Sequence, residues 1–355
     1  MKQSQKKYDR IVIKIGSSLI FSKQNTLDCS LLSEITAQVS GLMAQGKKIV
    51  LVSSGAIAIG MSILKLESRP KELSYLQAAA AIGQHELMDN YRKFFKQTSV
   101  NCGQVLLTWE DFDERSRYLN AKNTLLTLLK LNTVPVVNEN DTVSTSEIKF
   151  GDNDKLSALV SIMVGADLLI ILSDVDGLLD KDKKVIRIVD KVTPALKQLA
   201  CPTGRKTCVG GMITKLEAAR ISIDSGIPCI IANGRVKDVI KTCVEKGHEI
   251  GTLFVPKKEA LAAKMRWIAF GTKPKGKIIV DDGAREALEN KKSLLAVGVI
   301  ALEGEFVRGD IVTVRDEQGE EVARGKAGVS SEELKKVKGA RYDKEVIHRN
   351  NIVIL

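Results

Sequence analysis

A lysine inside an apolar strand is the first residue of this sequence that could carry chemistry. Lys14 lies in the apolar run 10–15, which ends in Gly16-Ser17-Ser18. A buried ammonium group is costly unless it meets an anion, and a loop led by glycine offers backbone amides that can bind phosphate. Lys14 is therefore either a phosphate ligand or an edge-strand lysine whose ammonium reaches solvent. This segment alone leaves both interpretations open.

A pair of glycines before a predicted helix is a second candidate anion site. The segment Gly210-Gly211-Met212-Ile213-Thr214-Lys215 leads into a helix expected near 213–225. A helix start exposes free N–H groups that attract phosphate, and Lys215 adds a positive charge. An ordinary glycine-containing loop is the alternative. The G-x-x-x-x-G-K-[ST] loop and the protein-kinase motifs around H-R-D and D-F-G are absent, so a nucleotide would have to be held by segments of this kind.

Two dense polar clusters form the third candidate. They are Asn138-Glu139-Asn140-Asp141, which ends a predicted strand, and Gly151-Asp152-Asn153-Asp154. Carboxylates and amides suit the recognition of an ammonium group, the ordering of lysines and the support of Mg²⁺. Asn and Asp are also common turn residues, so two solvated turns are the alternative.

The elements that would position these residues alternate between strand and helix over roughly the first 250 residues. Continuous apolar strands predict an α/β fold, with an open, mainly parallel sheet sandwiched by helices. Polar residues and glycines recur just after the strands, at 16–18, 53–55, 138–141 and 173–174. Ligands bind beyond the carboxyl ends of strands in such sheets, so these four clusters are the candidate walls of one site.

The pattern changes after the glycine- and proline-containing stretch 270–276, which we interpret as a linker. Short β-like segments follow it. The sequence therefore predicts a large domain over residues 1–270 and a small, mostly β domain over 276–355. A chain of 355 residues is long enough for two such cores.

Charge and composition narrow the function classes. The net charge is +11; from residue 272 onward 16 Lys and Arg face 15 Asp and Glu, so the tail carries +1 and the rest carries +10. A basic large domain fits a nucleotide or a nucleic acid. The six scattered cysteines predict neither a metal site nor a disulfide framework. No apolar run reaches the ~18 residues of a membrane span and no signal peptide is recognisable, so we expect a cytoplasmic protein.

Taken together, these motifs resemble the amino-acid kinase family, and in particular its branch that phosphorylates the side chain of glutamate. The matching stretches are 12–18, 52–60, 138–141, 151–158, 173–178 and 210–215, in the family's order. The pair N-E-N-D and G-D-N-D is the part most specific to that branch. The tail resembles a PUA domain through 278–284 and 306–310.

The resemblance implies a phosphotransferase that uses ATP and Mg²⁺ and has a carboxyl group as acceptor. It would convert L-glutamate to L-glutamyl 5-phosphate, the first step of proline biosynthesis. Lys14 and Lys215 would stabilise the transferring phosphoryl group, and Asp154 would hold both lysines. The implied substrate-binding residues are Ser54, Asp141 and Asn153, with Asn138 and Asp152 nearby. The implied nucleotide-binding residues are Lys14, Gly16, Ser173, Asp174, Val209, Gly210, Gly211, Met212, Ile213, Thr214 and Lys215.

Elementary chemistry agrees with this expectation. A carboxylate is already a nucleophile, so catalysis needs positioning and charge neutralisation and no general base. The sequence departs from the family pattern at Val209 and Ser173, where threonine is frequent. Val209 is expected to remove one hydroxyl contact to phosphate, while Ser173 keeps the hydroxyl.

Two other interpretations stay open. The acceptor could be another substrate of the family, such as N-acetylglutamate, aspartate or UMP, although the dense Asn and Asp clusters favour a free amino acid. RNA binding through the tail is the other; its near-neutral charge and lack of an aromatic run predict weak, salt-sensitive binding at most. The resemblance also implies a homo-oligomer, feedback inhibition by proline, and channelling to glutamate-5-semialdehyde dehydrogenase. No residue pattern establishes these three.

Overall fold

The computed structural model describes residues 8–21, 27–143, 153–200, 211–247, 249–256, 263–271 and 274–354. The chain divides into two compact units, Met1–Ala260 and Leu261–Leu355. The domain boundaries expected from the sequence, 1–270 and 276–355, remain a prediction. Three of the predicted site residues lie outside the described residues: Asp152, Val209 and Gly210.

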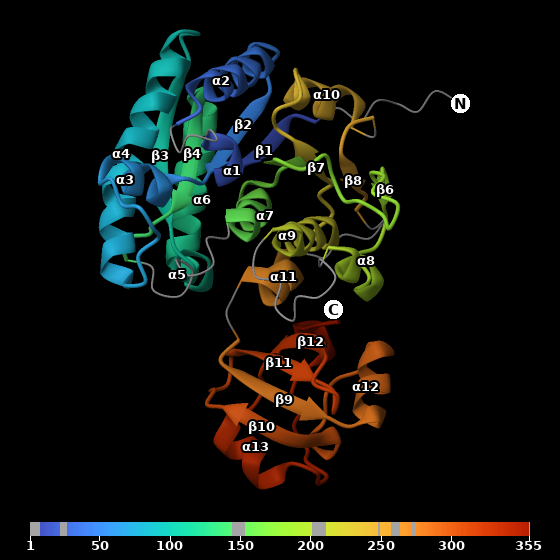
Figure 1. The fold of residues 1–355 in the computed structure, drawn as a ribbon. Coiled ribbons are helices and arrows are strands. Elements are labelled where there is room, and N and C mark those ends of the chain that lie inside the picture. Colours follow the sequence, from blue (N-terminus) through green and yellow to red (C-terminus); the bar gives the residue numbers. More distant parts are fainter. Residues whose placement is uncertain are drawn as a thin grey trace. The chain divides into compact units, whose positions relative to one another are not determined.

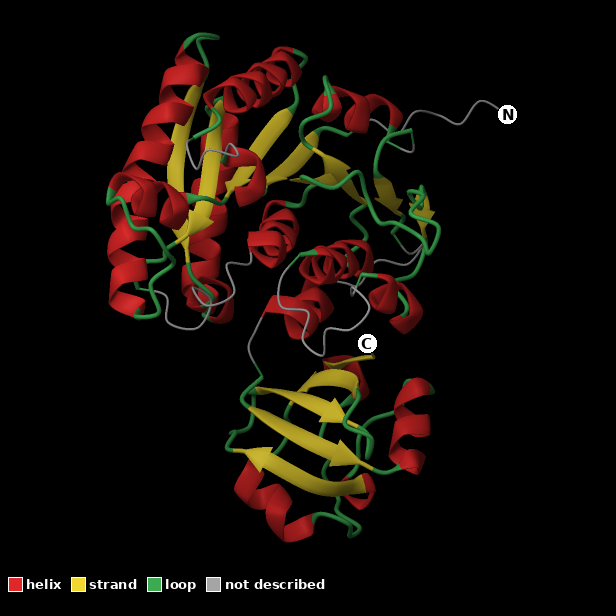
Figure 2. Ribbon diagram, viewed as in Figure 1, coloured by secondary structure: helices red, strands yellow, loops and turns green. Residues whose placement is uncertain are grey.

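The first unit is built on an eight-stranded sheet in the order β3-β4-β2-β1-β5-β7-β8-β6 (Figures 1 and 2). Its strands are β1 Arg10–Ile15, β2 Lys48–Ser53, β3 Asn101–Leu107, β4 Thr133–Glu139, β5 Leu168–Ser173, β6 Ile188–Val189, β7 Cys229–Asn233 and β8 Thr252–Phe254. All neighbours pair in parallel except β7 and β8, which are antiparallel. The prediction of a mainly parallel sheet is confirmed.

Helices cover both faces of this sheet (Figure 2). They are α1 Ser17–Ile20, α2 Cys29–Ala44, α3 Ala56–Ile63, α4 Leu73–Lys96, α5 Glu110–Asp113, α6 Arg115–Lys130, α7 Asn153–Val164, α8 Pro194–Leu199, α9 Met212–Asp224 and α10 Val239–Lys246. The central strands are buried on both sides, which explains why β5 is apolar at every position before Ser173.

Alternation along β1 decides which face each of its side chains meets. Ile11, Ile13 and Ile15 belong to a core with α2, α4 and α10. Side chains of a strand alternate between faces, so Lys14 projects to the other face, where α7 packs on β1, β2, β4 and β5 and α9 packs on α7. The two helices that border Lys14 are thus the two whose first turns carry predicted site residues.

Helices α3 and α4 pack with almost no space between their backbones. A Cβ atom added to Gly60 of α3 would lie 1.8 Å from the carbonyl oxygen of Ala79, and one added to Gly83 of α4 would lie 1.9 Å from that of Ala56. Only hydrogen side chains fit at these two positions. The contact holds the middle of α4 against the turn that joins β2 to α3.

The second unit contains a five-stranded sheet in the order β10-β9-β11-β12-β13. Its elements are α11 Ala263–Arg266, a π-helical turn Trp267–Gly271, β9 Gly276–Val280, α12 Asp282–Glu289, β10 Val299–Gly304, β11 Ile311–Arg315, β12 Glu321–Lys326, α13 Ser331–Val337 and β13 Ile352–Ile354. Its core includes Ile278, Val312, Val314 and Leu334. The predicted small, mostly β architecture is confirmed. In the described part of the chain, no helix is both long and apolar enough to cross a membrane.

Candidate active site

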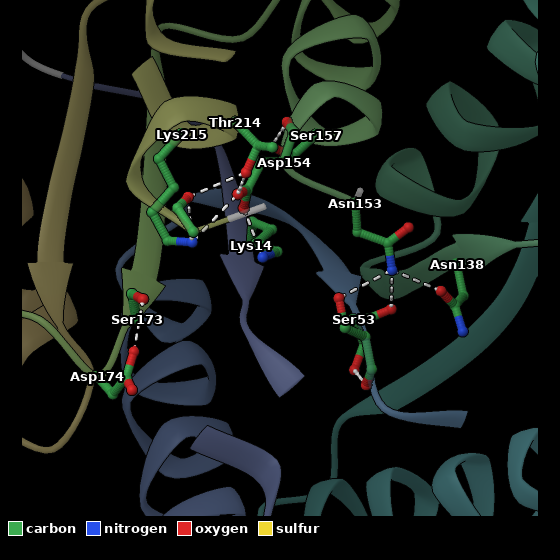
Figure 3. Close-up of polar contacts among 12 residues, drawn as sticks. Lys14, Ser53, Asn138, Asn153, Asp154, Ser157, Ser173, Asp174, Thr214 and Lys215 are labelled. Carbon is green, nitrogen blue, oxygen red and sulfur yellow. Dashed lines mark hydrogen bonds and ion pairs between the residues drawn. The ribbon is translucent and has the colours of Figure 1, made fainter. Parts of the chain in front are cut away.

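The first turn of α7 supplies both halves of the site (Figure 3). Asn153 and Asp154 are its first two residues and both are buried. The side chain of Asn153 reaches the ends of β2 and β4, while that of Asp154 reaches Lys14 of β1 and Lys215 of α9. One peptide unit therefore joins an amide cluster to a charged cluster.

The charged cluster consists of two lysines that share one carboxylate. Lys14 Nζ lies 2.5 Å from Asp154 Oδ1, and Lys215 Nζ lies 3.2 Å from Asp154 Oδ2. The hydroxyl of Thr214 donates to the same Oδ2 at 2.9 Å. The lysine side chains are 6% and 11% exposed and that of Asp154 is 4% exposed. Two buried cations facing one anion leave a net positive charge, which favours binding of a further anion here.

The protonation state of Asp154 follows from these neighbours. Burial by itself would raise the pKa of its carboxyl group, but the charges of Lys14 and Lys215 and the hydrogen bonds from Lys14 and Thr214 outweigh burial and hold the pKa below its usual value. Asp154 is therefore ionised at neutral pH. An ionised carboxylate with both oxygens engaged orients lysines and does not serve as a proton acceptor.

Lys14 is not an edge-strand lysine. It pairs in register with Val52 of β2 and Ile171 of β5, so its strand is central, and only 5% of the residue is exposed. The alternative that its ammonium reaches solvent from an edge is wrong. The adjacent Gly16 is packed closely, since a Cβ there would lie 3.2 Å from the carbonyl oxygen of Leu172. Its own amide donates to that oxygen, so any free amides of this loop belong to the residues after it.

Ser173 ends β5, the strand next to the one that carries Lys14, and Asp174 follows it. The hydroxyl of Ser173 donates to Asp174 Oδ1 at 3.1 Å. Burial would raise the pKa of the Asp174 carboxyl, but hydrogen bonds from its own backbone amide, from Ser173 and from Ser18 hold it below the usual value. The ionised carboxylate thus lies just beyond the end of β5, within hydrogen-bonding distance of Ser18 in the segment after β1.

The described part of the glycine segment caps α9. Gly211 adopts φ +77° and ψ −134°, a conformation that L side chains rarely adopt, and directly precedes Met212 at the helix start. Met212 and Ile213 are half-buried and Gly211 is exposed. Thr214 and Lys215 both turn back, donating to the Gly211 carbonyl oxygen at 3.0 and 3.3 Å as well as to Asp154. The start of α9 therefore contributes two side chains, Thr214 and Lys215, to the charged cluster.

The amide cluster is centred on Asn153. Its Nδ2 lies 2.9 Å from the Ser53 carbonyl oxygen, 3.0 Å from Ser54 Oγ and 2.8 Å from Asn138 Oδ1. Three of the predicted substrate-binding residues, Ser54, Asn138 and Asn153, are thus brought together at the ends of β2 and β4. Their buried polar atoms form a surface suited to a small polar molecule.

Asp141 lies in the turn after β4 and, within the part of the chain that the structure describes, makes no hydrogen bond to the amide cluster. Burial raises its pKa to about 6, an effect that the charge of Arg69 partly offsets. A carboxylate that is costly to ionise in the free protein gains most from a cationic partner. This favours the ammonium group of a substrate as its counter-charge.

Reasoning from the sequence missed two residues on α4. Gln84 Oε1 accepts a hydrogen bond from Asn138 Nδ2 at 2.8 Å, and the Tyr91 hydroxyl lies 2.9 Å from Ser53 Oγ. Through these contacts both side chains of α4 hold residues of the amide cluster and its strand end in place. Their spacing of seven residues places them two turns apart on one helix face, and a buried amide and phenol on that apolar face were the available signal.

Comparison with known proteins identifies the fold. The amino acid kinase family model matches residues 9–233. The chain belongs to the amino acid kinase family. A PUA domain model matches residues 276–348 as well. The sequence-based predictions of a kinase of this family and of a PUA-like tail are therefore confirmed, and membership of the family implies ATP as phosphoryl donor.

Several relatives within the amino acid kinase family are similar along their whole length. Proteins named Glutamate 5-kinase from Caldanaerobacter subterraneus subsp. tengcongensis and from a Thermoanaerobacter species are each 44% identical, over 98% of this chain and 98% of their own. A protein of the same name from Geobacter metallireducens is 43% identical over 99% of this chain and 98% of its own. The likeness therefore includes the tail.

Proposed function

We propose that this kinase transfers the γ-phosphoryl group of ATP to the side-chain carboxylate of L-glutamate, which yields L-glutamyl 5-phosphate in the first step of proline biosynthesis. The observation that carries the proposal is the convergence of Lys14 and Lys215 on Asp154, one α7 residue away from the amide cluster. The name shared by the relatives supports the same reaction.

The two lysines are placed to stabilise the transition state. Negative charge lies on the phosphoryl oxygens and on the attacking and leaving oxygens during the transfer. The buried ammonium groups of Lys14 and Lys215 are fixed before the reaction by their common partner, so they need little reorganisation when this charge develops. The acceptor carboxylate attacks directly and requires no base.

Asp154 acts as a positioning residue. It binds one lysine through each oxygen and takes a third hydrogen bond from Thr214. Because these lysines come from β1 and α9, the carboxylate joins the strand side of the site to the helix side. Its charge also lowers the cost of burying two ammonium groups.

The acceptor would lie on the amide cluster. We assign Ser54, Asn138 and Asn153 to the binding of glutamate, with Asp141 facing its ammonium group, and Asp152 nearby in the segment outside the described residues. Since Asn153 and Asp154 are neighbours in the chain, a glutamate held here presents its side-chain carboxylate toward the lysines.

ATP would bind between β1, β5 and the start of α9. Gly16, Ser173 and Asp174 would line one side, and Gly211 to Lys215 the other. Val209 and Gly210, which lie outside the described residues, are assigned to the same site from the sequence alone. Among the described residues no group of three acidic, histidine or cysteine side chains is placed to hold a metal by itself. Mg²⁺ commonly binds through substrate phosphates, waters and one or two carboxylates. Asp174 fits that role, because both oxygens of Asp154 are engaged by lysines.

Acyl phosphate trapping tests the proposed reaction. Purified protein is incubated with ATP, Mg²⁺ and hydroxylamine, and the hydroxamate is measured with glutamate, aspartate or N-acetylglutamate as acceptor; UMP phosphorylation is measured by ADP release. We expect glutamate-dependent hydroxamate far above the other acceptors. Absence of turnover with glutamate together with turnover of another acceptor would contradict the assignment.

We further propose the partners that the family likeness implies. The product is a reactive acyl phosphate, which supports direct transfer to glutamate-5-semialdehyde dehydrogenase. Proline shares the α-amino and carboxylate groups of glutamate, which supports feedback inhibition. Apolar side chains exposed on α3 and α4, among them Ile63 and Tyr75, support a homo-oligomer. The need for ATP and free glutamate supports a cytoplasmic location.

We assign the PUA unit to assembly or regulation. Its net charge of +1 offers little attraction to RNA phosphates. Titration of the full-length protein with RNA at several salt concentrations checks this, since tight binding that resists salt would contradict the assignment.

A further inference from the structure

The side chain of Gln84 on α4 lies against the amide cluster, with one end of its amide unused. The residue is 9% exposed, and its Oε1 accepts from Asn138 Nδ2 at 2.8 Å. Its Nε2 is shielded from solvent and has no hydrogen-bond partner among the residues that the structure describes. Buried polar groups without a partner are rare in native proteins, so this one calls for an explanation.

The neighbouring hydrogen bonds determine which way the amide of Gln84 faces. Asn138 Oδ1 accepts from Asn153 Nδ2 and from the backbone N–H of Glu139. Its Nδ2 therefore turns to Gln84, and a donor can be met only by the oxygen of that amide. The network thus assigns Oε1 of Gln84 to Asn138 and leaves two N–H groups of Nε2 for something else.

Backbone packing places Gln84 in the wall of the acceptor site. Its neighbour Gly83 lies against the carbonyl group of Ala56, and Ala56 directly follows the Ser54-Gly55 turn. Gln84 is therefore held between the Ser54 turn and Asn138. It binds Asn138 Nδ2, whereas Asn153 binds Asn138 Oδ1, and Asn153 is followed in the chain by Asp154, which holds the lysines.

We propose that Gln84 is a further substrate-binding residue, whose Nε2 donates hydrogen bonds to the α-carboxylate of the acceptor amino acid. The proposal rests on the proposed function. Glutamate carries three charged groups, and chemistry excludes two as partners for Nε2. The ammonium cannot accept a hydrogen bond, and the side-chain carboxylate must lie at the lysines to react. The α-carboxylate remains, and it accepts hydrogen bonds only.

The sharpest test replaces the amide by an acid of the same shape. Gln84→Glu keeps an oxygen for Asn138 but replaces the donor with a group that repels a carboxylate. We expect KM for glutamate to rise on the order of 10- to 100-fold, with kcat and KM for ATP little changed, because a contact made equally in ground and transition states affects KM alone. Hydroxamate formation over a range of glutamate concentrations measures both constants.

Two further variants separate ligand binding from support of the fold. Gln84→Met has similar volume and no charge, so it folds even where a buried acid does not, and its KM for glutamate should rise over the same range. Asn90→Asp is the matched control. Asn90 is on the same helix and equally buried at 9%, but its amide donates within α4 to Glu86, so its KM should not change.

A substrate analogue identifies the group that Gln84 binds. L-isoglutamine has an α-carboxamide in place of the α-carboxylate, so the wild type should use it at least about tenfold less efficiently than glutamate. In Gln84→Glu that carboxamide can donate to the new acid, and the preference for glutamate over isoglutamine should fall at least about tenfold. Equal use of both compounds by the wild type would overturn the proposal without any variant.

The outcomes separate this proposal from the one on which it rests. No hydroxamate from glutamate with the wild type would refute the proposed function. Wild-type turnover with an unchanged KM in Gln84→Glu and Gln84→Met would refute only the assignment of Gln84. A fall in melting temperature with unchanged KM would make Gln84 a support for Asn138 and likewise overturn the proposal.

Discussion

Lys14 of β1 and Lys215 of α9 are far apart in the sequence but bind different oxygens of one carboxylate. Each ammonium is thus held at a fixed place relative to the other before any nucleotide binds. Because Asp154 binds both lysines, substitution of any one of these three residues should change the position or the charge of the other two.

Replacement of either lysine should act on the chemical step. We expect Lys14→Ala and Lys215→Ala each to lower kcat by about 10²-fold or more while KM for glutamate changes little, because the charge matters most in the transition state. Steady-state hydroxamate assays measure both constants. Lys93→Ala, at an exposed position of α4, serves as the control. An unchanged rate in either variant would remove that lysine from the mechanism.

Removal of the shared carboxylate should affect stability and activity together. Asp154→Asn leaves two buried ammonium groups without their counter-charge, which should cost about 3–5 kcal/mol of unfolding free energy and most of the turnover. Urea denaturation measures the first effect. Because the variant site is more positive, the rise in melting temperature on adding ATP should be at least as large as in the wild type. A smaller rise would indicate that the cluster does not face the phosphates.

The raised pKa of Asp141 predicts a pH dependence with a definite sign. Its pKa is about 6 in the folded protein against a usual 3.8, so between these values the folded state holds more protons than the unfolded state. The contribution of Asp141 to stability is therefore present below about pH 4 and is lost as the pH rises through 6. Comparison with Asp141→Asn by thermal unfolding from pH 4 to 7 should show this difference.

The same titration should appear in substrate binding, with the opposite sense. Only the ionised Asp141 attracts an ammonium group, so kcat/KM for glutamate should fall as the pH drops below about 6. In Asp141→Asn this dependence should disappear, with KM for glutamate above the wild-type value at pH 7 and close to it at pH 5, where Asp141 is also uncharged. A wild-type profile that stays flat between pH 5 and 7 would argue against contact between Asp141 and the substrate.

The close crossing of α3 and α4 predicts a site at which a methyl group is not tolerated. Gly83→Ala would place Cβ 1.9 Å from the Ala56 carbonyl oxygen, so the helices must separate at a cost of about 1–3 kcal/mol or more. KM for glutamate should also rise, since Ala56 follows the Ser54 turn. Gly41→Ala in α2 is the matched control, because nothing lies within 4 Å of that Cβ. It should be neutral or stabilising.

Much of the first unit could be predicted from local patterns. The helix expected near 213–225 is α9, Met212–Asp224. The sheet could be identified because strands that are buried on both faces are apolar at consecutive positions of the sequence. Lys14 stood out for the same reason, since a charge in such a run requires an anion.

The remaining features depend on contacts between distant elements. The packing of Gly60 and Gly83 against facing backbones is set by how α3 crosses α4, which residue spacing within either helix does not encode. The role proposed for Gln84 depends on the orientation of its side-chain amide. That orientation follows only from the hydrogen bonds that run from Asn153 through Asn138 to Gln84. The short strands β6 and β8 were likewise not predicted, because runs of two and three residues carry little pattern.

The adjacency of Asn153 and Asp154 in α7 limits how this enzyme could be changed to accept another substrate. A larger or smaller amino acid would need the amide cluster to shift, but any movement of the first turn of α7 would also displace the carboxylate that holds both lysines. Under the proposed function, acceptor choice and phosphoryl transfer are therefore mechanically coupled. Engineering of new specificity should leave α7 untouched and remodel the far wall, on α4 and after β4, where changes can be made without disturbing the charged cluster.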